Sequence, residues 1–191
     1  MPSSPGSIAM KLIRLPFLLL ACVFALAPVA SHAASRQEID AKVREAVETL
    51  YKTSSAAKEL AGHASGMLVF PAVYKGGIGI GGEYGEGALL EGGHIAGYFN
   101  IISASVGFQL GAQRKSVVIL FMTAEALKRF EDVKGFKIGV DGSVAIATLG
   151  TGGGIDSETA QKPVIGFIYS NQGLMYNLTL EGSKITRIHK K

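Results

Sequence analysis

The first regular pattern of apolar and polar positions begins after residue 34 and has the period of a helix. Apolar residues recur three or four positions apart, at Ile39, Val43, Val47 and Leu50. Ser35 is followed three residues later by Glu38, the spacing of a capping box, which places the start of the helix. The pattern therefore predicts an amphipathic helix after Ser35, and a short second helix follows through residues 56–60.

From residue 67 onward the pattern changes to a period of two, which is typical of strands. Residues 105–112 alternate small or polar with apolar side chains, and residues 77–81 alternate glycine with isoleucine. Twelve glycines fall within residues 76–111, and such a row in strands indicates strong curvature or close approach of another backbone. Further strands are expected at 67–70, 117–122, 136–140, 143–149, 164–170, 174–180 and 184–188, with a short helix after Thr123.

These elements predict one α+β domain over residues 34–191. Its sheet is expected to be curved or barrel-like and mostly antiparallel, because only the helix after Thr123 offers a crossover. The N-terminal helices and the one short helix are expected to pack on that sheet. Pro71 is expected to end the strand that begins at residue 67.

The segment before this domain has the pattern of an export signal. Residues 15–31 carry no charge, Lys11 and Arg14 precede them, and small residues follow at 30–34. We interpret residues 1–33 as a signal peptide cut after Ala33, with Met10 as a second candidate for the first residue. The protein is then exported, and is periplasmic or membrane-tethered in the cell envelope.

Cys22 leaves a second outcome open for this segment. Residues 19–22 partly resemble a lipoprotein box, although Leu20 stands where that motif prefers a small residue. A lipid attached to Cys22 would tether the protein to a membrane, whereas simple export would remove the residue with the signal peptide. The sequence does not decide between the two.

Charge and composition argue against several classes of function. The net charge of +4 is too small to favour a nucleic-acid partner, and the single cysteine excludes a disulfide framework and a Cys-rich zinc site. The histidines lack metal-ligand spacing, and the glycines at 77, 79 and 82 are not followed by the helix that a dinucleotide site needs. No nucleophile elbow is present. We expect no metal, no cofactor and no enzymatic activity.

The residues that favour lipid binding are cations beside apolar positions. Lys42 and Arg44 flank the apolar stripe of the first helix, as in helices that lie in a membrane interface. Together with a basic pair near residue 114, they give the predicted contacts with anionic lipid: Ile39, Lys42, Val43, Arg44, Val47, Arg114 and Lys115. Acidic residues in the same helix cancel its charge, so the alternative is a helix that docks on its own sheet.

Several glycine-anchored stretches occur in an order that is similar to the SYLF-domain family. They lie at residues 66–77, 81–90, 97–98, 106–113, 118–122, 143–145, 173–174 and 180–183. The resemblance implies binding of membrane lipids, notably phosphoinositides in eukaryotic members, with a contribution from an amphipathic N-terminal helix. Some eukaryotic members bind and bundle actin.

Residues and resemblance together predict a non-enzymatic domain that binds anionic phospholipid at a membrane of the cell envelope. The alternative is a protein-interaction or actin-bundling module of the same family. The sequence leaves the lipid, a protein partner and the oligomeric state open.

Overall fold

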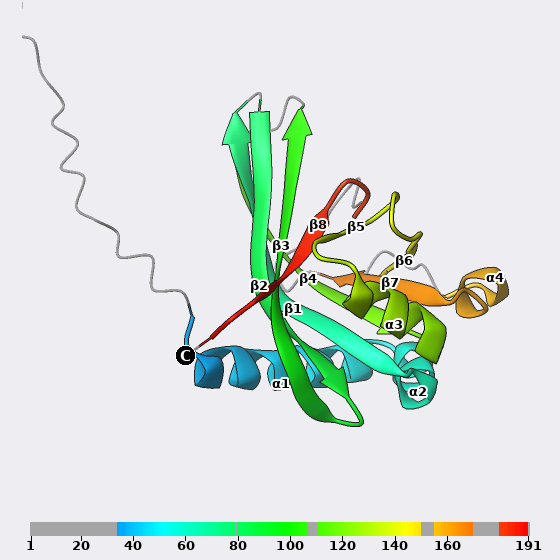
Figure 1. The fold of residues 1–191 in the computed structure, drawn as a ribbon. Helices are drawn as coiled ribbons and strands as arrows, with labels where there is room; N and C mark the ends of the chain where they lie inside the picture. Colours follow the sequence, from blue (N-terminus) through cyan, green and yellow to red (C-terminus); the bar gives the residue numbers. More distant parts are fainter. Residues whose placement is uncertain (1–33, 79, 107–110, 150–154, 170–179, 191) are drawn as a thin grey trace, which may run out of the picture. The chain divides into compact units, whose positions relative to one another are not determined.

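The computed structural model describes residues 34–78, 80–106, 111–149, 155–169 and 180–190 (Figure 1). The predicted signal peptide, with Cys22, and most of the predicted strand over 174–180 lie outside these residues. The elements in chain order are α1 (Arg36–Thr53), α2 (Ser55–His63), β1 (Gly66–Ile78), β2 (Ile80–Glu91), β3 (His94–Val106), β4 (Gly111–Phe121), α3 (Ala124–Asp132), β5 (Phe136–Lys137), β6 (Ala145–Thr148), α4 (Ser157–Ala160), β7 (Val164–Tyr169) and β8 (Lys184–Ile188).

The strands form one sheet in the order β5-β8-β3-β2-β1-β4-β7-β6, curled into a half-barrel. Every pairing of neighbouring strands in it is antiparallel except β6 with β7. The prediction of an α+β fold with a curved, mostly antiparallel sheet is confirmed. Figure 1 shows the long strands β1 to β4 running past α1, with their far ends extending beyond the helices.

Two strand boundaries differ from the prediction for identifiable physical reasons. Pro71 does not end β1, because the pairing of β1 with β2 shifts register between Val69 and Ala72, and a bulge tolerates the missing N–H of proline. The strand expected over 136–140 ends at Lys137 instead. Gly139 then adopts φ 88°, a left-handed conformation that turns the chain out of the ladder.

The helices begin where their capping residues place them. The Ser35 side chain accepts a hydrogen bond from the backbone N–H of Glu38, and Thr123 caps α3 through the N–H of Ala126. These caps satisfy backbone donors that the first helical turn leaves without partners. The start of α1 and the short helix after Thr123 were therefore predictable from sequence.

Each face of the sheet carries its own apolar core. On one face, α1 packs its buried residues Ile39, Val43, Ala46 and Leu50 on strand residues such as Val69, Val118 and Phe167. On the other face, Phe130 of α3 lies at the centre of an aromatic cluster, with ring centroids 4.8–5.4 Å from those of Phe121, Phe99 and Phe136. The strands between the two cores are buried on both sides, which explains the continuous apolar run at 117–121.

One glycine of β2 is required by close approach of the neighbouring backbone. At Gly87, an added Cβ would overlap the carbonyl oxygen of Val69 and lie 2.8 Å from Cδ1 of Phe70. This is the point where β1 bulges toward β2, so no side chain fits. At Gly76, by contrast, an added Cβ meets no atom within 4 Å.

These two glycines form a matched pair for a stability test. We expect Gly87→Ala to lower the free energy of unfolding by at least about 2 kcal/mol, because the new methyl group cannot avoid backbone atoms. Gly76→Ala should leave stability within about 0.5 kcal/mol or raise it by up to about 1 kcal/mol, because alanine reduces the entropy of the unfolded chain. Urea denaturation measures both, and equal effects of the two variants would contradict the close approach at Gly87.

Candidate functional site

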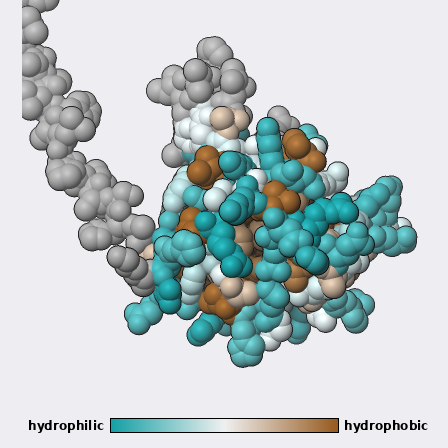
Figure 2. Space-filling model, viewed as in Figure 1, coloured by the Kyte–Doolittle hydropathy of each residue, from teal (hydrophilic) through white to brown (hydrophobic). Residues whose placement is uncertain are grey.

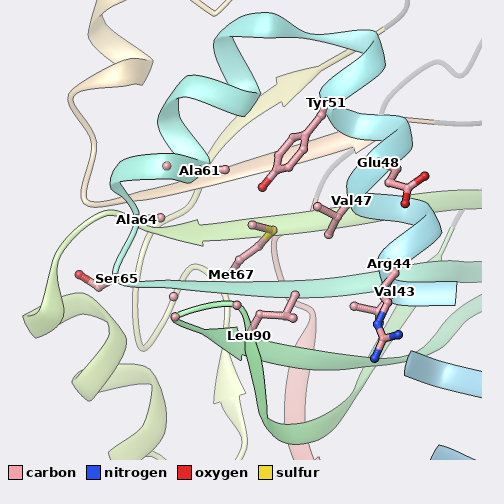
Figure 3. A pocket seen from close by; sticks show the side chains of 14 residues that line it. Val43, Arg44, Val47, Glu48, Tyr51, Ala61, Ala64, Ser65, Met67 and Leu90 are labelled. Carbon is pink, nitrogen blue, oxygen red and sulfur yellow. The ribbon is translucent and has the colours of Figure 1, made fainter. Parts of the chain in front are cut away.

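A groove with a volume of about 530 Å³ opens along one flank of α1 (Figure 3). Its walls come from α1, the end of α2, the start of β1, and the end of β2 with the turn that follows it. Figure 3 shows side chains from these elements converging on the cavity: Val47, Tyr51, Met67 and Leu90. The groove is therefore formed by segments that are distant in sequence and held together by the docking of α1.

The groove is apolar within and charged at its rim. Val47, Met67 and Leu90 form its apolar walls, while the charged groups of the rim are Arg44, which is exposed, and Glu48. Lys52 lies 3.9 Å from Glu48 in the next helical turn and offsets the charge of that carboxylate. Burial raises the pKa of the Tyr51 hydroxyl, so this group stays neutral. The volume lies within the roughly 300–1,000 Å³ of small-molecule pockets, and the arrangement suits an amphiphile with an apolar body and an anionic group.

Local sequence explains why this flank of α1 is open. Val43, Val47 and Tyr51 are spaced four residues apart, so they line one side of the helix. Opposite them, α2 and the residues after it contribute small side chains at Ala61 and Ala64. The β2–β3 turn contributes glycines 92 and 93, with φ of 56° and 82°, a conformation that favours residues without a side chain. Because α2, the segment after it and the β2–β3 turn all contribute small residues here, the space beside α1 is left unfilled.

The structure brings three of the predicted lipid contacts, Val43, Arg44 and Val47, together in this groove. Two of the apolar residues of the stripe are packed inward, since Ile39 is 2% exposed and Val43 is fully buried. Val47 is half-buried and faces the cavity (Figure 3). In this conformation α1 is docked on the sheet, and the apolar surface that remains accessible is the groove rather than the stripe itself.

Two further predicted contacts, Lys42 and Arg114, meet at the opposite flank of α1. They line a small polar cleft of about 20 Å³, little more than the space of one water molecule. Lys42 Nζ lies 2.6 Å from Glu38 Oε1. Tyr169 also lines this cleft, and its hydroxyl donates a hydrogen bond of 2.6 Å to the carbonyl oxygen of Ala46. Burial raises the pKa of this tyrosine to about 12.

Lys115 lies on the other face of the sheet from Arg114, as neighbouring residues of a strand must. Its side chain is 2% exposed, and Nζ is 2.7 Å from Glu83 Oε2. Lys75 Nζ lies 3.6 Å from the second oxygen of the same carboxylate. The Lys115 ammonium is thus held inside the protein by an ion pair.

A second ion cluster lies where α1 begins. The two oxygens of Glu86 accept hydrogen bonds of 2.8 Å from the Tyr84 hydroxyl and from Lys190 Nζ. Burial opposes ionisation of Glu86, but the hydrogen bonds from Lys190 and Tyr84 outweigh it and hold the pKa of this carboxyl below its usual value. Burial, followed by the bond to Glu86, raises the pKa of Tyr84 to about 12. Lys190 and Glu86 are 104 residues apart, so the local sequence pattern did not indicate this pairing.

Sequence reasoning also missed the strand residues of the groove. Met67 and Leu90 are directly opposed in the β1–β2 ladder and point to the side of the sheet that carries α1. Met67 lay in an expected strand, whereas no strand was expected at Leu90. Which strands pair, and in which register, could not be inferred from one sequence.

In the ranges that the structure describes, no helix is long and apolar enough to cross a membrane. The same ranges contain no group of three or more His, Cys, Asp or Glu side chains arranged to hold a metal ion.

Comparison with known proteins identifies one family. Residues 102–190 match the family described as "Ysc84: Las17-binding protein actin regulator". This family is the SYLF-domain family, so the resemblance inferred from the glycine-anchored stretches is confirmed for that part of the chain. The match supports a lipid- or actin-related domain. No curated protein matches the chain.

The ion pair of Lys115 provides a stability test of its position. We expect Lys115→Met to lower the free energy of unfolding by about 3 kcal/mol, because it keeps the apolar stem but leaves the buried Glu83 carboxylate with only the more distant Lys75. The control is Lys128→Met, which removes an exposed pair with Asp132 and should cost less than about 0.5 kcal/mol. Chemical denaturation measures both, and a Lys115 variant as stable as its control would show that the pair is exposed in solution.

Proposed function

From the match of residues 102–190 to the Ysc84 family, we propose that this protein is a non-enzymatic domain that binds anionic membrane lipid. The observation that carries the proposal is the apolar groove beside α1, with Arg44 at its rim. An acyl chain or another apolar part of the lipid occupies the groove, and the anionic headgroup lies against the guanidinium.

The two parts of the groove contribute different interactions. Apolar walls favour a hydrocarbon chain by removing it from water, at about 25 cal/mol per Å² of surface buried. A guanidinium binds phosphate oxygens through paired N–H donors and adds about 1 kcal/mol near an anionic surface. Apolar burial should persist in salt, whereas the charge contribution should weaken.

In this proposal α1 acts as a wall of the site and stays folded against the sheet. Moving its stripe into a bilayer would expose the sheet residues that Ile39 and Val43 cover, such as Val69 and Val118. Such a move gains little free energy, because the apolar stripe is already buried on the sheet before it enters the bilayer. Lipid entry into the groove requires no such rearrangement.

We test the proposal with charge and volume changes at the groove. Arg44→Glu should weaken binding to vesicles of phosphatidylglycerol with phosphatidylcholine by about thirtyfold, the effect of two charge steps of about 1 kcal/mol each. The matched control is Lys58→Glu, which makes the same charge change on α2 at a residue that does not line the groove. Val47→Phe should fill part of the cavity and reduce binding of a fluorescent phosphatidylglycerol while the fold is retained.

Vesicle flotation and fluorescence titration measure these effects after circular dichroism has verified folding. Equal losses for Arg44→Glu and Lys58→Glu would show that the groove is not the headgroup site. Absence of wild-type binding to anionic vesicles at any salt concentration would overturn the proposed function.

The family description favours one other function, binding to a protein of the actin system. Filament co-sedimentation separates the two functions. Pelleting with actin filaments, without binding to anionic vesicles, would favour the protein-binding function.

We also propose that the protein is exported and that its N-terminal segment is processed. The charge-free run at 15–31 lies between basic and small residues, which is the pattern that signal peptidases recognise. Intact mass spectrometry of the protein from its native host is expected to give a chain that begins near Ala34, or one that carries lipid on Cys22. Recovery of the unprocessed chain from the cytoplasm would contradict export.

A further inference from the structure

A row of side chains crosses five strands just beyond the start of α1. Tyr74 of β1 opposes Tyr84 of β2, which opposes Ile102 of β3, so all three point to the same side of the sheet. Arg114 on β4 and Lys184 on β8 continue the row at its two ends. We call these five residues the tyrosine row. At the usual spacing between strands, it is about 19 Å wide.

The tyrosine row is on the side of the sheet that carries α1. Tyr84 lies four residues from Ala88, which packs in the α1 core, and Ile102 lies four residues from Tyr98, whose hydroxyl bonds to Asp40 of α1. Unlike those neighbours, the row is exposed. Tyr74 is 57% accessible, and Tyr84 and Ile102 are each 48% accessible. Soluble proteins seldom expose large apolar side chains side by side without a partner.

The surface next to the row is flat. Two residues farther along each strand lie Gly76, Gly82 and Ala104, which are again directly opposed. An added Cβ at Gly76 would meet no atom within 4 Å. Figure 2 shows pale surface at the upper end of the molecule, next to the grey atoms, and mostly hydrophilic surface over the lower part. The small residues at these three positions therefore leave room for a broad flat object beside the tyrosines.

The charges of the row favour an anionic object. Exposed cations stand at both ends, at Arg114 and Lys184, and Lys137 of β5 opposes Lys184 directly. The carboxylate beside the tyrosines belongs to Glu86, and its two oxygens bind the Tyr84 hydroxyl and Lys190. Lys190 balances this carboxylate. Glu45 lines the cleft beside Arg114, and Asp141 accepts a hydrogen bond from the Lys137 N–H, so the net positive charge of this surface is modest and is carried mainly by Lys184 and Lys137.

We propose that the tyrosine row is a second membrane contact, on which the domain lies against an anionic lipid bilayer. Tyr74 and Tyr84 lie at the level of the headgroups, where amphipathic aromatic rings are enriched, and Arg114 and Lys184 contact lipid phosphates. This inference rests on the proposed lipid-binding function. It also predicts how the domain is oriented on the bilayer, because the row and the groove both lie on the side of the sheet that carries α1.

The absence of tryptophan from the sequence allows a position-specific test in the full chain. Tyr74→Trp introduces a single reporter at the most exposed of the row's three large apolar residues, and Lys128→Trp places one on α3 at the opposite face. With vesicles of equimolar phosphatidylglycerol and phosphatidylcholine, we expect a blue shift of the Tyr74→Trp emission and quenching by brominated acyl chains. The emission of Lys128→Trp should not change.

A charge pair at Gly76 provides the second measurement. Gly76→Glu and Gly76→Lys differ mainly in the sign of the group placed beside the row, and a Cβ at this position meets no atom within 4 Å. We expect Gly76→Glu to weaken vesicle binding about fivefold and Gly76→Lys to strengthen it about fivefold. Thermal melting should be similar for both, since the position is open.

The outcomes separate this inference from the proposed function. If wild type binds anionic vesicles and Arg44→Glu weakens that binding, but the Tyr74→Trp reporter behaves like Lys128→Trp and both Gly76 variants bind equally, the row is not a membrane contact. If Gly76→Glu instead abolishes a concentration-dependent dimer detected by sedimentation, the row is an interface between copies of this chain. Without wild-type binding to anionic vesicles, both proposals fail.

Discussion

Burial of the α1 stripe against the β1–β2 face of the sheet is the contact on which the accessible surfaces of this domain depend. It covers the middle of one face with Ile39, Val43 and Leu50, while surface beside the helix and beyond its start stays accessible among the described residues. The apolar groove is the uncovered flank, and the tyrosine row is the uncovered continuation of the strands. An amphipathic helix can serve a membrane in two ways, by inserting or by shaping a site, and the docked position favours the second.

Cations that look equivalent in sequence occupy different environments in this fold. Arg114 and Lys115 are adjacent, yet one side chain is exposed beside α1 and the other is buried on the far face with Glu83. Their different positions follow from strand alternation, which sends neighbouring residues to opposite sides. A basic pair in a strand is therefore weak evidence for a basic patch, whereas cations aligned across strands, such as Arg114 and Lys184, do share a surface.

Sequence predicted the parts of the fold that depend on local chemistry. Ser35 and Thr123 marked the starts of helices because capping is a contact between near neighbours, and the apolar spacing after Ser35 identified the face that α1 buries. Features set by pairing between strands were not predictable. The bulge near Pro71, the meeting of Met67 with Leu90, and the row through Tyr74 all depend on register, which a single sequence does not encode locally. For this reason the sequence identified the helix side of the groove and missed its sheet side.

Glu86 joins the two ends of the described domain through one carboxylate. It accepts a hydrogen bond from the backbone of Ala34, just before α1, and binds Lys190, just after β8. Arg36 strengthens this junction by donating a hydrogen bond of 2.6 Å to the carbonyl oxygen of Lys190. Segments at the boundary of a domain usually fray independently and exchange their amide hydrogens quickly. Here the first turn of α1 and the residues after β8 share their partners, so we expect protection of one segment against exchange to depend on the other.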